Sequence, residues 1–186
     1  MDQEKQFRIW CQEIRAGDKA SFNACFHSLY PELCTFAARY LRDRDAAMDM
    51  VQDAFVKLWN IRLDLNERKS LKAFMYTMVR NLCLNHIRDV QDKEALIGFS
   101  EIEKLEEPQA DSSEAMQHKQ KLRALIDQLP DRQKECLELS RFDGLSHQEI
   151  AEVLNLSART VNNHIVSALK SLKTKFEQLK ESTMVL

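Results

Sequence analysis

Residues 145–165 read Leu145-Ser-His-Gln-Glu-Ile-Ala-Glu-Val-Leu-Asn-Leu-Ser-Ala-Arg-Thr-Val-Asn-Asn-His-Ile165, and this stretch decides the fold. Ser146 and Glu149 have the spacing of an S-x-x-E capping box, which predicts a helix beginning at His147. Asn155 follows that helix, and asparagine accepts the left-handed backbone of a tight turn better than most residues. Ser157 can cap a second helix. The stretch therefore predicts a helix-turn-helix, the unit that places a recognition helix in the DNA major groove.

The second predicted helix has an apolar face and a polar face. Its apolar residues repeat at helical spacing and are expected to face inward: Val161, Ile165, Ala168, Leu169 and Leu172. The polar residues around its start, where groove-reading side chains belong, are Ser157, Arg159, Thr160, Asn162, Asn163 and His164. A plain helical hairpin would also have a polar surface. Because Asn-Asn-His is poor helix chemistry at exposed positions, this face favours DNA binding.

The composition of the 186-residue chain indicates an all-α protein of two small helical domains. Only 3 glycines and 3 prolines are present, too few for the many turns of an all-β chain. The formal net charge of −2 is unlike that of a free-standing DNA-binding domain, which is usually basic. We therefore expect DNA contacts to use local basic patches, and the acidic remainder to suit another partner.

The cysteines and the N-terminus indicate a reduced, cytoplasmic protein. The five cysteines show neither C-x-x-C nor paired Cys/His spacing, so we expect no metal, no cofactor and no disulfide framework. The first residues are polar and acidic, which argues against a signal peptide. The most apolar stretch, residues 71–88, contains Lys72 and Arg80 and is not expected to insert into a membrane.

Three segments follow from the patterning: an N-terminal helical domain over residues 1–90, a linker over 91–114 and a C-terminal helix-turn-helix domain over 115–182. Residues 89–114 hold nine acidic residues and two lysines without a sustained apolar period. Such a composition cannot bury enough surface to fold, which predicts an acidic, flexible linker.

A helix predicted from Asp45 has one polar face. Asp49, Gln52 and Asp53 share that face, while apolar residues repeat on the other. On charge alone, this polar face is best interpreted as solvated surface.

A helix predicted over residues 70–88 lies in a basic stretch. From Arg68 to Arg88 there are five basic residues and no acidic one, with Phe74 and Tyr76 interleaved. Phosphate neutralisation together with base stacking is what single-stranded nucleic acid requires. A core helix with snorkelling basic side chains explains the same pattern equally well.

Taken in order, these segments resemble the extracytoplasmic-function sigma factors of bacterial RNA polymerase. Asp45-Ala-Ala-Met-Asp-Met-Val-Gln-Asp-Ala-Phe-Val-Lys-Leu-Trp59 is similar to the polymerase-binding helix of that family. Leu71-Lys-Ala-Phe-Met-Tyr-Thr-Met-Val-Arg-Asn81 is similar to its promoter-melting segment. The other similar stretches are Tyr30-Pro-Glu-Leu-Cys-Thr-Phe-Ala-Ala-Arg-Tyr-Leu41, Leu129-Pro-Asp-Arg-Gln-Lys-Glu-Cys-Leu137 and Thr160-Val-Asn-Asn-His-Ile165.

The resemblance implies a non-enzymatic initiation factor with several macromolecular partners and no small-molecule substrate. Asp49, Gln52 and Asp53 would dock on the clamp helices of the polymerase β′ subunit. The helix at 158–170 would read the −35 element of promoter DNA, and the acidic connector would thread the channels of the polymerase. The resemblance also implies a cognate anti-sigma factor.

The resemblance further implies a site for the −10 element. Asn81 would help to hold a flipped base, and the loop at 62–70, which includes the acidic Glu67, would form the pocket. Base extrusion suits a melting protein, because reading a single strand requires unstacked bases. The residues expected at this surface are Lys69, Phe74, Tyr76, Arg80, Asn81 and Arg88.

Two other functions compete with this one. A regulator of the two-component output type would bind operators through the same helix-turn-helix without polymerase. It would need a receiver or a ligand-binding domain, and the first block lacks the alternating strands of a receiver. A helical interaction protein with a degenerate helix-turn-helix would not bind DNA.

Overall fold

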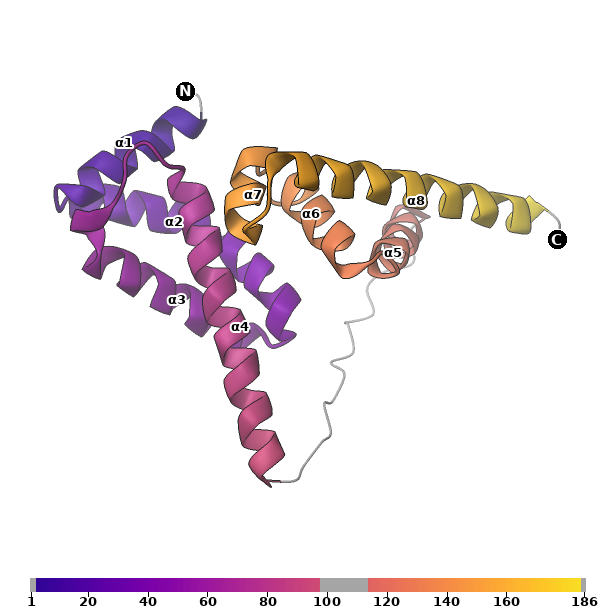
Figure 1. The fold of residues 1–186 in the computed structure, drawn as a ribbon, viewed down its shortest axis with the longest axis horizontal. Coiled ribbons are helices and arrows are strands. Elements are labelled where there is room, and N and C mark those ends of the chain that lie inside the picture. The colour runs from indigo at the N-terminus through magenta and orange to yellow at the C-terminus, as the bar shows by residue number, and fades with distance from the viewer. Residues whose placement is uncertain (1–2, 98–113, 185–186) are drawn as a thin grey trace. The chain divides into compact units, whose positions relative to one another are not determined.

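The computed structural model describes residues 3–97 and 114–184, which form eight α-helices and one short 3-10 helix and contain no strand. The chain divides into two compact units; the first holds α1 to α4, and the second holds α5, α6, α8 and most of α7 (Figure 1). The all-α class is confirmed, and the described residues of the first unit lack the strands of a receiver domain. In chain order the elements are α1 (Gln3–Arg15), α2 (Lys19–Leu41), α3 (Arg44–Asn60), η1 (Arg62–Asp64), α4 (Leu71–Ile97), α5 (Glu114–Asp127), α6 (Asp131–Arg141), α7 (His147–Leu154) and α8 (Ala158–Met184).

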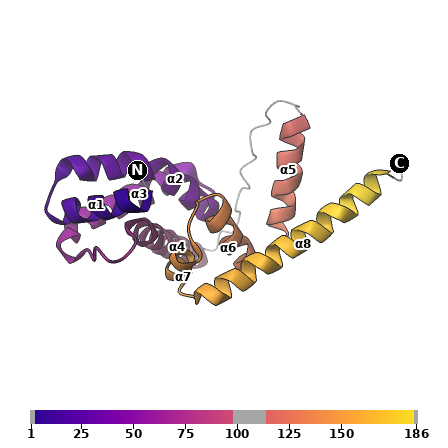
Figure 2. The same ribbon diagram turned by 90° about the horizontal axis from the view of Figure 1, so that it is seen from above.

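The core of the first unit lies where α2, α3 and α4 pack against one another (Figure 2). Leu33 and Phe36 on α2, Leu58 on α3 and Val79 on α4 are each at most 1% exposed. Burying one such side chain stabilises the fold by about 1.5–3 kcal/mol. Helix α1 packs against α2 and α4, and its Ile14 is fully buried.

Aspartate caps set where α2 and α3 begin. Asp18 accepts hydrogen bonds from two backbone N–H groups in the first turn of α2, at 3.2 and 3.1 Å. Asp43 does the same for α3, at 2.9 and 3.1 Å. Arg42, with a φ of 54°, ends α2 in the left-handed conformation. Each cap satisfies N–H groups that have no partner within the helix, and so fixes the residue at which its helix begins. Arg42 and Asp43 alone connect α2 to α3.

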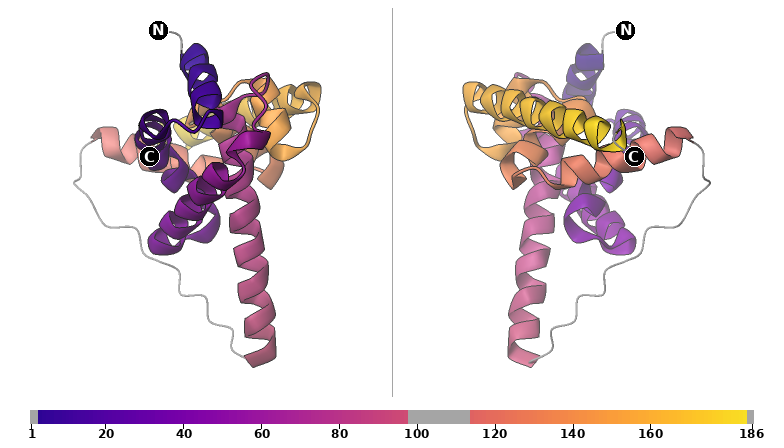
Figure 3. Two further views of the ribbon diagram at one scale, coloured as in Figure 1. Left: turned by 90° about the vertical axis from the view of Figure 1, so that its left-hand side faces the viewer. Right: turned by 90° about the vertical axis from the view of Figure 1, so that its right-hand side faces the viewer.

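Helix α4 is longer than the sequence predicted. It continues to Ile97, past residue 90 where the linker was expected to begin, and it extends well beyond α2 and α3 (Figure 3). Residues 91–97 include Gln, Lys, Glu, Ala and Leu, which are good helix formers, so they prolong the helix despite their charge. Helical structure resumes at Glu114, and the rest of the predicted linker, residues 98–113, lies outside the described residues.

The second unit is built around α8, which packs against α6 and α5. Cys136 and Leu139 on α6 are at most 1% exposed. Gly144, with a φ of 65°, lies in the turn between α6 and α7, a conformation that suits glycine. Nearby, the buried Glu138 carboxylate lies 3.1 Å from the Arg123 guanidinium of α5, so its charge is paired.

Membrane insertion was not expected from the sequence. Within residues 3–97 and 114–184, no helix combines the length and the apolar character that crossing a bilayer requires.

Candidate nucleic-acid and protein interfaces

The helix-turn-helix is formed by α7, a short turn and the start of α8. Ser146 donates its backbone N–H to the Glu149 carboxylate at 2.8 Å, and Glu149 donates its N–H to Ser146 Oγ at 3.3 Å, which is the predicted capping box. Asn155 has a φ of 54°, the left-handed conformation expected at the turn. Ser157 caps α8 by accepting from the Thr160 N–H at 3.0 Å. The caps and the turn of this unit are therefore made by residues that lie close together in the sequence.

The start of α8 carries the predicted polar face. Arg159, Asn162 and Asn163 are exposed, whereas His164 and Thr160 are half-buried. The Thr160 hydroxyl lies 2.7 Å from the Ser157 hydroxyl, so both side chains already contribute to the cap. Arginine and asparagine at the N-terminal end of such a helix are suited to paired hydrogen bonds with guanine and adenine edges.

The opposite face of α8 follows the predicted apolar pattern with one error. Val161, Ile165 and Ala168 are buried, and Leu172 is half-buried. Leu169 was expected inward but is 40% exposed. Successive residues of a helix are about 100° apart around its axis. Because Ala168 continues the buried face of Val161 and Ile165, Leu169 lies to one side of that face.

In the first unit, exposed polar residues follow one face of α4. Asn81 and Arg88 are exposed and therefore accessible to nucleic acid, whereas Arg80 is half-buried. Asn85, which sequence reasoning missed, lies between them at helical spacing, and its Oδ1 accepts a hydrogen bond from Arg88 Nη2 at 3.3 Å. The i, i+4, i+7 spacing of Asn81, Asn85 and Arg88 is the signal that could have identified it.

The structure contradicts one predicted member of this surface. Tyr76 is fully buried, and its ring centroid lies 4.8 Å from that of Phe36 on α2. Lys72, one turn earlier, is also buried, and its Nζ lies 3.3 Å from the Glu32 carboxylate. Residues four apart lie on the same face of a helix, and here that face packs on α2. The alternative interpretation, a core helix, therefore holds for this part of α4.

Phe74 and Lys69 meet at a cavity instead. A space of about 270 Å³ lies between α1, the loop at 61–70 and the start of α4. Asn66 holds the loop by accepting from the Arg68 N–H at 3.0 Å, and Ser70 caps α4 by accepting from the Ala73 N–H at 3.1 Å. The residues that line the cavity are Cys11, Ile61, Asp64, Leu65, Asn66, Lys69, Ser70, Leu71 and Phe74.

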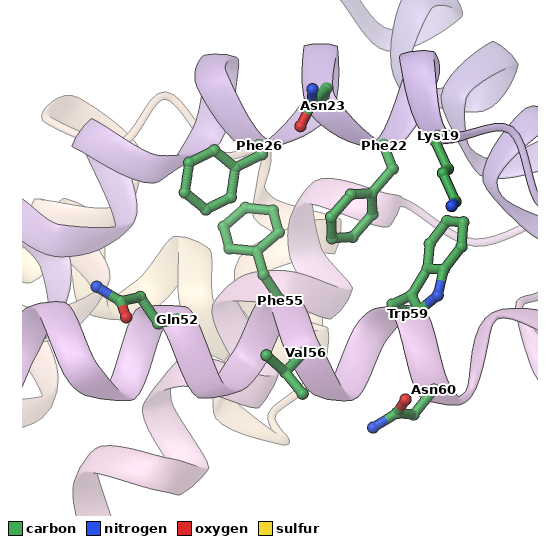
Figure 4. Close-up of a pocket in the computed structure, with 9 residues that line it drawn as sticks. All are labelled: Lys19, Phe22, Asn23, Phe26, Gln52, Phe55, Val56, Trp59 and Asn60. Carbon is green, nitrogen blue, oxygen red and sulfur yellow. The ribbon is translucent and has the colours of Figure 1, made fainter.

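The polar face of α3 is exposed at all three predicted positions, Asp49, Gln52 and Asp53. Beside it, a groove of about 630 Å³ runs between α2 and α3 (Figure 4). Gln52 lies at one end of the groove, and Val56, which is 60% exposed, lines it from α3. Four aromatic side chains line it: Phe22, Phe26, Phe55 and Trp59. The α3 surface is therefore acidic on one side and apolar on the other.

The cysteines are free thiols. Burial raises the pKa of Cys25 to about 12 and the pKa of Cys136 to about 11, so neither forms a thiolate near neutral pH. The parts of the chain that the structure describes bring together no three His, Cys, Asp or Glu side chains that could hold a metal ion.

Comparisons with known proteins match this architecture. The family described as Sigma-70 region 2 matches residues 25–93, and Sigma-70, region 4 matches residues 119–172. The ECF RNA polymerase sigma factor SigK of Mycobacterium ulcerans is 24% identical over 87% of this chain and 89% of its own length. The RNA polymerase sigma-H factor of Pseudomonas aeruginosa is 25% identical over 95% of this chain and 96% of its own length.

Solved structures share the fold. CnrH, in a complex with the cytosolic domain of CnrY, has a TM-score of 0.65 and 21% identity over 93% of this chain and 98% of that one. The sigma factor RpoE from Bartonella quintana, in a complex with the anti-sigma factor NepR, has a TM-score of 0.61 and 24% identity over 84% of this chain and 96% of that one. The two matched regions cover more than half of the chain, and they fall on α2 to α4 and on α5 to α8. The chain therefore belongs to the sigma-70 family and, within it, to the extracytoplasmic-function sigma factors of RNA polymerase.

Proposed function

We propose that this sigma factor uses three separate surfaces during initiation. The polar face of α3 binds core polymerase, the start of α8 reads the −35 element as duplex, and the cavity beside α4 holds a base of the −10 element. The observation that carries this assignment is the exposed set Arg159, Asn162 and Asn163 on a capped recognition helix, in a chain whose net charge is −2. Such a chain has base-reading groups but little general attraction for DNA, so it needs a partner to bind promoters.

The −35 contact divides into reading and positioning. Arg159, Asn162 and Asn163 are free of the helix core and project where base edges would lie. Lys170, further along α8, is exposed and suited to a phosphate, which fixes the orientation but carries no sequence information. Lys175 is less suited, because its ammonium lies 3.1 Å from the side-chain oxygen of Gln128, the residue that follows α5.

The −10 contact combines a concave site with a polar stripe. The cavity offers the Phe74 ring for stacking on a base and the Lys69 ammonium for attraction to phosphate. Proteins that bind single-stranded DNA combine these two kinds of contact. Asn81 and Arg88 lie further along α4 and would follow the strand backbone. We expect a base that leaves the duplex during melting to enter this cavity.

The polymerase contact uses charge and apolar area together. Asp49 and Asp53 give the face of α3 a negative charge that suits a basic or polar partner surface, here the β′ clamp helices. The adjoining aromatic groove supplies the apolar area that a charged face lacks.

Regulation follows by analogy with the structural relatives, whose solved forms contain CnrY and the anti-sigma factor NepR. We expect an anti-sigma factor to bind this chain as well. We also expect the protein to act in the cytoplasm, where RNA polymerase works, and to initiate transcription without catalysing a reaction itself.

The test is whether DNA binding depends on polymerase. Gel-shift measurements on a randomised duplex DNA pool would compare the chain alone, core polymerase alone and the two together. We expect sequence-selective binding only from the mixture. Selective binding by the chain alone would favour the operator-binding regulator, and no selective binding in any lane would favour the helical interaction protein.

A further inference from the structure

We propose that Gln12 and Arg15 of α1 form a brace on Glu67 that positions the wall of the −10 cavity, so that base preference at this cavity depends on α1. This inference rests on the proposed function of the cavity. Gln12 and Arg15 are positioning residues, since neither lines the cavity itself.

The brace connects distant parts of the chain. Gln12 Nε2 donates to one oxygen of the Glu67 carboxylate at 3.0 Å, and Arg15 Nη1 donates to the other at 3.2 Å. Gln12 and Arg15 are three residues apart, which places them one above the other on α1. The carboxylate is thus held by two donors on one rigid helix, and each oxygen has its own donor.

Glu67 lies in the loop at 61–70, and residues on both sides of it line the cavity. Asn66 and Lys69, on either side of Glu67, both line the cavity, and Cys11 lines it from α1. Burial raises the pKa of the Cys11 thiol, and the nearby Glu67 charge raises it further. Helix α1 therefore lines the cavity itself and also holds the loop that lines it.

The brace also pairs the negative charge of Glu67 with a positive charge. A carboxylate in a loop that faces DNA would repel phosphate, and the Arg15 guanidinium offsets this charge. Both side chains are partly exposed, at 49% and 37%, so the ion pair contributes little to global stability. Its loss should move or loosen the loop without unfolding the unit.

A looser loop should weaken base preference at the promoter position that the cavity binds. If the cavity is formed only part of the time, affinity for the base that fits it falls in proportion to the formed fraction. Preference at one downstream promoter position should then weaken by about two- to five-fold, the range that an exposed ion pair supports. Upstream preference, read by α8, should not change.

The experiment uses holoenzyme assembled from core polymerase and the full chain. The probe is a linear DNA library randomised upstream of a fixed transcribed segment, and sequencing the transcripts gives base preference at each position. The variants are Arg15→Glu, Glu67→Arg and the charge-swapped double variant. Arg8→Glu is the matched control, because Arg8 is exposed on the same face of α1 two turns away. Thermal melting of each chain checks the fold.

We expect Arg15→Glu and Glu67→Arg each to flatten preference at one downstream position, and the double variant to restore it. Arg8→Glu should resemble the wild type. A double variant as flat as the single variants would overturn the brace, because Arg15 would then act on DNA or on folding rather than through Glu67. Equal preference in Arg15→Glu and wild type would overturn it too. A wild-type holoenzyme that selects no sequence would instead overturn the proposed function, and this inference with it.

Discussion

Tyr76 of α4 packs on Phe36 of α2 with ring centroids 4.8 Å apart, and neither side chain is more than 1% exposed. Phe74, two residues earlier on the same helix, is half-buried and lines the cavity beside the loop at 61–70. Because residues two apart lie on different sides of a helix, Tyr76 belongs to the core between α2 and α4, whereas Phe74 faces the cavity.

Substitution of Tyr76 should therefore affect mainly stability, and substitution of Phe74 mainly promoter-dependent transcription. Tyr76→Ala should lower the free energy of unfolding of the first unit by about 3–5 kcal/mol, through lost burial and the cavity left behind. Phe74→Ala should cost less stability and should weaken transcription that depends on the −10 element. Chemical denaturation and promoter-specific transcription measure the two effects. A stable Tyr76→Ala variant with a selective loss at the −10 element would reverse the assignment.

Polymerase docking should depend on the acidic face of α3. Replacing Asp49 and Asp53 with Arg places positive charge where complementary charge is required, and affinity for core polymerase should fall by about tenfold or more. The fold should survive, since both side chains are exposed. Asp89→Arg with Asp92→Arg on α4 is the control, because it makes the same charge change on another exposed helical face. Equal capture of core enzyme by both double variants, with native circular dichroism, would refute the assignment.

The two faces of α8 should separate reading from folding. Asn163→Ala and Arg159→Ala should lose sensitivity at single positions of the −35 element, each worth about 1–3 kcal/mol of discrimination, with little change in melting temperature. Ile165 is 5% exposed, and Ile165→Ala should destabilise the second unit by about 2–5 kcal/mol. Transcription from a panel of −35 variants, together with thermal melting, checks both. Uniform weakening on every promoter would identify phosphate contacts rather than base readers.

Alkaline pH should destabilise the first unit through its buried thiols. Burial raises the pKa of Cys25 from 9.0 to about 12 and that of Cys83 to about 11. The folded state holds these protons more tightly than the unfolded state does, so the stabilisation is complete below pH 9 and is lost as the pH rises through 11 to 12. Cys25→Ala should show a flatter decline than wild type over this range, measured by denaturation at each pH. Parallel declines would show that the Cys25 thiol does not contribute.

Local patterns predicted the helix-turn-helix because its determinants are close in sequence. The capping box of Ser146 and Glu149, the left-handed Asn155 and the Ser157 cap each depend on residues within four positions. The all-α class and the exposed face of α3 followed from composition and periodicity for the same reason.

Features that depend on tertiary contacts did not follow from the local sequence pattern. Tyr76 was expected at a DNA surface because it lies in a basic stretch, but the rotation of α4 against α2 decides which aromatic is buried. The brace on Glu67 joins residues more than fifty positions apart, and periodicity gives no signal for such a pair. Acidic composition predicts a linker from residue 91, but residues 91–97 have enough helix propensity to continue α4 to Ile97.

The most direct test of the central claim is transcription of the randomised library by core polymerase with and without this chain, with each promoter sequenced from its transcript. We predict selected promoters only when the chain is present, with base preference in two separate blocks. Asn163→Ala should remove preference within the upstream block, and Asn81→Ala within the downstream block. Identical transcripts with and without the chain, or a single block of preference that neither variant alters, would contradict the account.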